Sequence, residues 1–292
     1  MPLRLSKKMN RKEFILKTIA IGILTVLISL SNAQEVSYEV STVARIVGDT
    51  PDEILEQLNA KDLKLEHVTY YTEESIIEGL SYNSRASEIA HILKNQFLEE
   101  NNILLNTNFW PSSSEWKRNE LLILEAQSTA PEYACLHWNC RTPIDFDWNL
   151  ENVKPLILFD SDFSGLYVPK AHDKSESFVG RFSQDSVMIA TTAIPDREFV
   201  KAFVCNLARY STYHSIPAKD KWSVGEIYRF SRNSYYWHSS KPSGLALISY
   251  ELYGLPYLKV SVPHAALDDK TFEYCERYYR GDFSYGEGVT SG

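Results

Sequence analysis

The sequence predicts an α+β fold, with a main sheet flanked by a few helices. Three observations support this class. Hydrophobic residues make up 44% of the 292 residues, enough for a real core. Short apolar runs typical of strands are frequent, and few helical segments separate them. The chain also lacks the glycine-rich dinucleotide fingerprint and the phosphate loop that many doubly wound folds carry.

The first 33 residues differ from the rest and are typical of a secretion signal. Six basic residues precede or enter an apolar run from Ile19 to Leu30, which is too short for a comfortable membrane span. Ser31-Asn32-Ala33 then offers the small residues that signal peptidase requires, with Gln34 as the new N-terminus. We therefore expect export to the periplasm or the extracellular space. An uncleaved membrane anchor is the alternative.

Removal of this segment makes the chain strongly acidic. It takes away six basic residues and one acidic residue, which leaves 24 Lys and Arg against 37 Asp and Glu, a net charge of −13. A chain of this charge is repelled by phosphate backbones and by anionic lipid. Neither nucleic acid nor a membrane surface is expected as the main partner.

Four cysteines, Cys135, Cys140, Cys205 and Cys275, all lie in the mature part. An even number in an exported chain favours disulfides, and the three possible pairings stay open. A zinc site formed by Cys135, His137 and Cys140 is the alternative, although the spacing is not that of a standard finger.

In the first half of the mature chain, residues 36–47 alternate enough to form a strand. Thr50-Pro51-Asp52-Glu53 is typical of a helix start, with Thr50 as the cap and Glu53 completing a capping box. Apolar residues at helical spacing predict a helix over about 87–100. Two apolar runs predict strands at 121–124 and 156–159.

The second half has a clearer pattern. Val187 to Thr191 is predicted as a buried strand, and Pro195-Asp196 opens a helix with apolar residues on one side. We expect three further strands, at residues 225–230, 245–250 and 258–262.

Six short motifs follow one another in an order that carries functional information. They are Arg45 with Pro51-Asp52-Glu53-Ile54 behind it, His172 upstream of Phe178-Val179, Ala190-Thr191-Thr192, Gly225 to Asn233, Ser249-Tyr250-Glu251 ahead of Gly254-Leu255-Pro256-Tyr257, and Arg277-Tyr278-Tyr279. In this order they resemble the catalytic (A) chain family of the cholera and heat-labile enterotoxins, and more loosely the pertussis-toxin-like mono-ADP-ribosyltransferases.

The resemblance covers residues 36–62 and about 166–280. It implies an ADP-ribosyltransferase-like split β-sheet core with flanking helices, formed by residues 34–292. Residues 66–165 are unmatched, and we interpret them as a large insertion. The activity implied is that of a secreted, toxin-like enzyme that transfers ADP-ribose from NAD, its substrate, to a target protein.

The resemblance also assigns roles to single residues. Glu251 would be the catalytic carboxylate that stabilises an oxocarbenium-like state and holds the ribose 2′-hydroxyl. Arg45 would bind the pyrophosphate side of NAD through charge-assisted hydrogen bonds. His172 would contact the adenosine ribose. Thr191, together with Thr192, would brace the glutamate. Ser249 occupies the position that orients the acceptor.

The chain departs from the family pattern at Ala44, Val47, Ala190 and Ser249. The family has a second glutamate at the position of Ser249 when the acceptor is arginine, so a protein acceptor modified at another residue is expected. The long C-terminal helix that threads a B-pentamer is not recognisable, and a B-type subunit is not expected. Two alternatives remain. One is a catalytically degenerate binding protein with the toxin fold, and the other is an unrelated exported binding protein with disulfides.

Overall fold

The computed structural model describes part of the chain, and all described residues belong to the unit Thr42–Gly292. They are residues 44–48, 50–59, 62–74, 84–97, 103–106, 121–131, 133–136, 139–143, 155–167, 177–183, 186–212, 222–238, 244–263 and 267–279. The expected secretion signal, the first part of the strand expected at 36–47, and His172 lie outside these residues.

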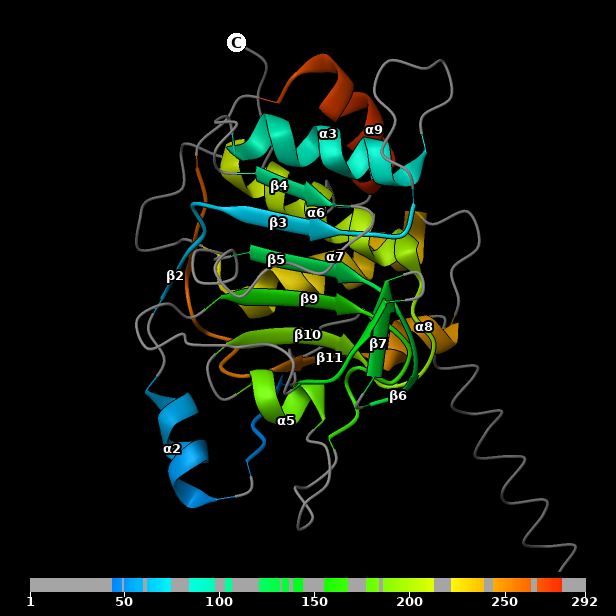
Figure 1. Ribbon diagram of the computed structural model, residues 1–292. Coiled ribbons are helices and arrows are strands. Elements are labelled where there is room, and N and C mark those ends of the chain that lie inside the picture. Colours follow the sequence, from blue (N-terminus) through cyan, green and yellow to red (C-terminus); the bar gives the residue numbers. More distant parts are fainter. Residues whose placement is uncertain are drawn as a thin grey trace, which may run out of the picture. The chain divides into compact units, whose positions relative to one another are not determined.

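A seven-stranded sheet with the order β1-β11-β10-β9-β5-β3-β4 forms the centre of the fold (Figure 1). From β4 to β10 every neighbouring pair is parallel, whereas β11 runs antiparallel to β10 and β1 runs parallel to β11. The strands are β1 (Ala44–Arg45), β3 (Val68–Tyr71), β4 (Ile103–Asn106), β5 (Leu121–Glu125), β9 (Leu156–Asp160), β10 (Val187–Thr191) and β11 (Tyr250–Tyr253).

The central strands are mainly apolar because both faces of the sheet are covered. All five residues of β5, of β9 and of β10 are buried, which is the usual pattern of a parallel sheet. Successive side chains point to opposite faces, so Leu121 and Ile123 belong to one hydrophobic cluster and Leu122 and Leu124 to another. The fold therefore has two cores, one on each side of the sheet.

Helices cover the larger core, and a mixed layer covers the smaller one. Apolar residues of α3 (Arg85–Phe97), α6 (Arg197–Thr212), α7 (Val224–His238) and α9 (Asp269–Tyr279) contribute to the larger core. The smaller core includes the short helix α5 (Phe178–Phe182) and residues of β7 (Tyr133–Leu136). The described part of the chain also contains the helices α2 (Pro51–Leu58) and α8 (Gly244–Ser249). No helix of the described part is long and apolar enough to cross a membrane.

Two small sheets and two disulfides complete the architecture. β7 lies between β6 (Gln127–Ala130) and β8 (Asn139–Arg141) in an antiparallel sheet, and β2 (Leu63–Lys64) pairs with β12 (Val260–Ser261). One disulfide, Cys135–Cys140, joins β7 to β8, and the other, Cys205–Cys275, joins α6 to α9. The zinc site that Cys135, His137 and Cys140 could have formed is wrong, because Cys135 and Cys140 are bonded to each other in a disulfide.

The structure confirms several predicted elements. Helix α2 begins at Pro51, and the Thr50 hydroxyl accepts a hydrogen bond from the Glu53 backbone N–H at 3.3 Å. The helix expected over 87–100 is α3, and the one opened by Pro195-Asp196 is α6. The apolar runs at 121–124, 156–159 and 187–191 form the strands β5, β9 and β10. The general class, strands and flanking helices, is also observed, with a mostly parallel main sheet.

Three expected strands are corrected by the structure. Residues 225–230 lie in α7, and residues 245–249 lie in α8, so only Tyr250 of the second segment is a strand residue. The third shrinks to the two residues of β12. The helix α7 has a reciprocal capping box. The Ser223 backbone N–H donates to the Glu226 carboxylate at 2.7 Å, and the Glu226 N–H donates to the Ser223 hydroxyl at 3.3 Å.

Residues 66–165, which the enterotoxin resemblance leaves unmatched, are built into the main sheet. They supply β3, β4, β5 and β9, four of its seven strands.

Candidate functional site

The structure brings together two of the predicted site residues, Arg45 and Glu251, from neighbouring strands. β1 pairs with β11, and this pairing places the two side chains side by side although 206 residues separate them. Arg45 Nη2 donates to Glu251 Oε1 at 2.7 Å, and Arg45 Nε lies 2.6 Å from Glu251 Oε2. The arginine side chain is 60% exposed and the carboxylate 19%. The result is a two-pronged ion pair that solvent can reach.

Tyr253 supports the carboxylate from behind. Its hydroxyl lies 3.0 Å from Glu251 Oε2 and also contacts the Gly165 carbonyl oxygen. Burial, reinforced by the negative charge of Glu251, raises the pKa of Tyr253 above its ordinary value, so the phenol stays protonated and can donate. Gly165 is required here by space. A Cβ at this position would lie 2.9 Å from the backbone of Thr191.

The other predicted site residues take structural positions around this pair. The Thr191 side chain is buried and donates its hydroxyl to the Ser161 carbonyl oxygen. Thr192 donates its N–H to the Ser249 carbonyl at 2.8 Å and its hydroxyl to the same oxygen at 3.1 Å. The Ser249 hydroxyl donates to the Leu245 carbonyl at 2.6 Å within α8. These three residues therefore fix the backbone next to Glu251.

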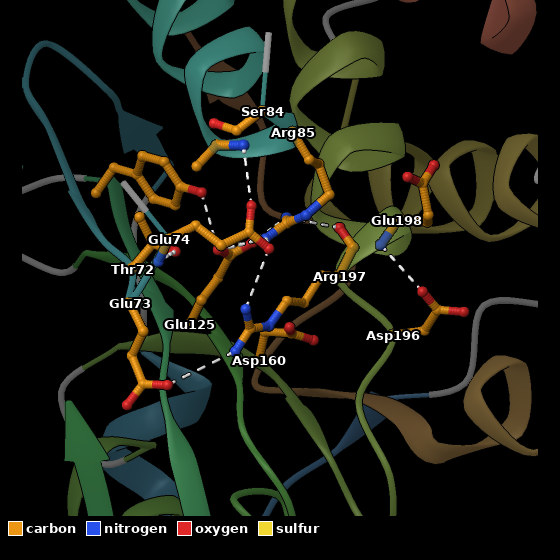
Figure 2. A network of polar contacts seen from close by, with 12 residues as sticks. Thr72, Glu73, Glu74, Ser84, Arg85, Glu125, Asp160, Asp196, Arg197 and Glu198 are labelled. Atoms are coloured by element: carbon orange, nitrogen blue, oxygen red, sulfur yellow. Dashed lines mark hydrogen bonds and ion pairs between the residues drawn. The ribbon is translucent and has the colours of Figure 1, made fainter. Parts of the chain in front are cut away.

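A second polar cluster lies where the parallel strands β3, β5 and β9 end (Figure 2). The carboxyl edge of such a sheet is where α/β proteins usually bind ligands. Glu125, the last residue of β5, is fully buried. Its carboxylate accepts two hydrogen bonds from the Arg85 guanidinium and one from the Tyr70 hydroxyl at 2.8 Å. A buried carboxylate is tolerated here because an arginine is bound to both of its oxygens.

Arg85 extends the cluster toward a second acid and a second helix. It donates to Glu74 at 2.9 Å and to the Arg197 carbonyl at 3.0 Å, at the start of α6. Glu74 also accepts from Arg197 at 3.1 Å and from the Ala86 N–H at 3.3 Å. Burial alone would raise the pKa of Glu74, but the hydrogen bonds and charge of Arg85, then of Arg197, lower it. The first turns of α3 and α6 are held together by these charges.

Asp160, the last residue of β9, is 1% exposed and has no ion pair among the described residues. Burial, and then the nearby charge of Glu125, raises its pKa to about 7. Its Oδ1 contacts the Tyr250 hydroxyl, which also accepts from the Asp196 N–H at 2.9 Å. Its Oδ2 is a buried oxygen with no hydrogen-bond partner, as is Oγ of Ser161. Burial and the charge of Glu125 thus favour the neutral form of this carboxyl group.

Sequence reasoning missed this cluster, although a signal for it was present. Each of the two apolar runs at 121–124 and 156–159 is followed directly by an acid, Glu125 and Asp160. An acid that ends a buried parallel strand lies at the carboxyl edge of the sheet, where a partner is required. Arg85 had no such signal, because its partners come from distant segments.

Three further features bear on what the described part of the chain can do. All four cysteines are in disulfides, so the chain has no free thiol for nucleophilic catalysis. A cavity of about 450 Å³ lies by β2 and β12, away from both polar clusters, lined by Lys64, Leu65, Glu66, His67, Ser261, Val262 and Pro263. No group of acids, histidines and cysteines in the described part could hold a metal ion.

Neither a family model nor a curated protein matches this chain. Among solved structures, it is similar to the Arg-specific cysteine proteinase gingipain R, at 12% identity over 73% of this chain and 52% of that one, with a TM-score of 0.49. It is also similar to the complex of Porphyromonas gingivalis RgpB pro- and mature domains, at 13% identity over 73% of this chain and 53% of that one, with a TM-score of 0.49. The structure of pro-sf-caspase-1 is similar at 10% identity over 73% of this chain and 94% of that one, with a TM-score of 0.37. The chain thus spans about half the length of the two gingipain chains.

Proposed function

We propose that this chain is an exported, disulfide-stabilised binding protein that recognises another protein. The exposed aromatic and aliphatic side chains of α7 and α8 carry this proposal. The acids at the carboxyl edge of its parallel sheet, Glu125 and Asp160, are 0% and 1% exposed and serve the fold. A catalytic acid or base must come within hydrogen-bond reach of its substrate, and a substrate cannot reach either of these groups. The disulfides fit an oxidising compartment, as an exported chain requires.

The surface best suited to a protein partner lies on α7 and α8. Near the end of α7, Tyr236 and Trp237 contact each other edge to face, and Trp237 is 64% exposed. On α8, which packs against α7, Leu245 and Ile248 are exposed, Ile248 to 67%. Neighbouring exposed aromatic and aliphatic side chains are typical of interaction sites, where tryptophan and tyrosine contribute most of the binding energy.

A comparison of two double variants tests this proposal. The mature chain, tagged and immobilised, would be exposed to the secreted proteins of the cells that produce it. Binding of a specific partner should be lost when Trp237 and Ile248 are both changed to Ser. It should persist in the control Leu55→Ser/Leu58→Ser, which alters two exposed apolar residues of α2. Recovery of the same proteins by wild type and by both variants would reject α7 and α8 as the binding surface.

A second candidate function is mono-ADP-ribosyl transfer from NAD to a protein, and the Arg45–Glu251 pair favours it. The enterotoxin resemblance assigns NAD binding to the arginine and catalysis to the glutamate, and the two side chains meet on the solvent side of β1 and β11. Binding of NAD would require Arg45 to exchange a carboxylate for a phosphate, which a guanidinium binds with the same fork geometry. Glu251 would then be free to accept a hydrogen bond from the ribose 2′-hydroxyl and to stabilise positive charge on the ribose.

The hydrolysis of NAD by the mature protein distinguishes the two functions. The transferase predicts release of nicotinamide that falls by at least about 100-fold in Glu251→Gln, since the carboxylate stabilises the transition state. Lys270→Gln serves as a control, because Lys270 is an exposed residue of α9 and takes no part in the Arg45–Glu251 pair. Equal rates for the wild type and Glu251→Gln would remove the transferase from consideration. The binding protein predicts no turnover in any of the three.

A further inference from the structure

The two disulfides occupy opposite environments. Cys205 and Cys275 are both 0% exposed and belong to the larger core. Cys140 is exposed and Cys135 half-buried, in the small sheet β6–β7–β8. Thiol–disulfide exchange needs a thiolate to reach one of the sulfurs, so access separates a reactive disulfide from an inert one. Only the disulfide between β7 and β8 meets this condition.

Loss of the exposed disulfide should cost less stability than loss of the buried one. Cys135 and Cys140 are directly opposite in the β7–β8 register and only 5 residues apart, whereas Cys205 and Cys275 are 70 residues apart. A short closed loop restricts the unfolded chain less than a long one does, so the hairpin disulfide contributes less to stability. The register of the hairpin would also keep the two thiols close, so that the disulfide can form again.

The hairpin is connected to the polar cluster at the carboxyl edge. Gln127 of β6 is the register partner of Cys135 in β7. The Gln127 side chain donates to Glu73 at 2.7 Å, and Glu73 lies 3.9 Å from Arg197, which binds Glu74. If β7 and β8 became more flexible, β6 would transmit the change to the segment that carries Glu73 and Glu74.

We propose that Cys135–Cys140 is a thiol–disulfide exchange site, acted on by a dithiol-bearing partner, that controls the order of the sheet β6–β7–β8. A thiolate of the dithiol attacks Sγ of Cys140, the exposed residue of the pair. This step breaks the Cys135–Cys140 bond, forms a mixed disulfide and releases Cys135 as a thiolate, which takes up a proton. The second thiol of the dithiol then displaces Cys140 as a thiol. The dithiol leaves as a disulfide, having supplied both electrons and both protons.

The test is selective reduction of the mature chain by graded dithiothreitol, with alkylation of new thiols and peptide mass spectrometry. Cys135 and Cys140 should be labelled at a dithiothreitol concentration at least about ten-fold below that which labels Cys205 and Cys275, because only the first pair is accessible. Labelling of both pairs at one concentration would overturn the proposal. The variant Cys135→Ser/Cys140→Ser is the control, and it should show no labelling in the low range.

Hydrogen exchange after selective reduction tests the second part of the proposal. Amides of residues 127–136 should exchange faster by at least about ten-fold, while those of β5 and β9 stay unchanged, because the latter lie in the buried parallel sheet. Unchanged exchange at residues 127–136 would show that the disulfide does not order the small sheet. Equal acceleration in β5 and β9 would show general unfolding and would also reject a local switch.

Discussion

Glu125 and Asp160 are register partners at the ends of β5 and β9. Each is a buried carboxyl group, and the cost of burying it is offset in a different way. Glu125 is bound by the guanidinium of Arg85, whereas Asp160 has a pKa raised to about 7 and contacts the Tyr250 hydroxyl. Two neighbouring buried acids with one arginine cannot both be charged without cost. We therefore expect this edge of the sheet to respond to pH through Asp160.

The first prediction concerns stability against pH. Burial raises the pKa of Asp160 from 3.8 to about 7, so its contribution to stability is full below about pH 4 and is lost as the pH rises through 7. The urea midpoint of the wild type should fall between about pH 5 and 8, and that of Asp160→Asn should fall less. Glu74, whose pKa is lowered, acts in the opposite sense at more acid pH. Parallel curves for the two proteins would contradict this assignment.

The second prediction concerns the buried pair. Arg85→Met leaves Glu125 buried without its cation and should lower the free energy of unfolding by about 3–5 kcal/mol. Arg85→Met/Glu125→Met removes both charges and should lose less than the single variant, since no buried charge is left uncompensated. Denaturant unfolding of the three proteins measures both effects. A double variant that is less stable than the single one would show that the pair stabilises the fold beyond its own compensation.

The third prediction concerns the exposed pair. Arg45→Ala should change the free energy of unfolding by no more than about 1 kcal/mol, because surface ion pairs contribute little. Heat or urea unfolding measures this change. A larger loss would mean that the pair holds β1 on the sheet, and the residue would then be structural rather than a site residue.

The fourth prediction uses two glycines. Gly165→Ala places a Cβ 2.9 Å from the Thr191 backbone and should destabilise the fold by about 1–3 kcal/mol. Gly244→Ala, with nothing within 4 Å, should be neutral or slightly stabilising at the start of α8. Thermal unfolding of both variants provides the comparison. Similar losses at the two sites would refute the close approach of Gly165 to β10.

The sequence predicted the elements whose signal is local. Buried strands such as β9 are continuous apolar runs, and α2 has a cap and a proline at its start. Residues 225–230 form a helix although their apolar residues also suit a strand, and the signal for the helix is the capping box of Ser223 and Glu226. The order of strands in the sheet is not a local property, so the contribution of residues 66–165 to its centre could not be read from spacing.

The candidate sites divide in the same way. Arg45 and Glu251 were found by resemblance, and their contact depends on the pairing of β1 with β11, which no local pattern encodes. Arg85 and Glu125 come together from segments 40 residues apart, and only the acid had a sequence signal.

Strand β1 has two residues, yet it covers the outer edge of β11. An uncovered strand edge presents free backbone groups to any other extended chain, which leads to strand addition and aggregation. Proteolytic trimming beyond Arg45 would uncover β11 and change how molecules associate in solution. The position of the N-terminal cut should therefore decide whether the edge of β11 is open to strand addition.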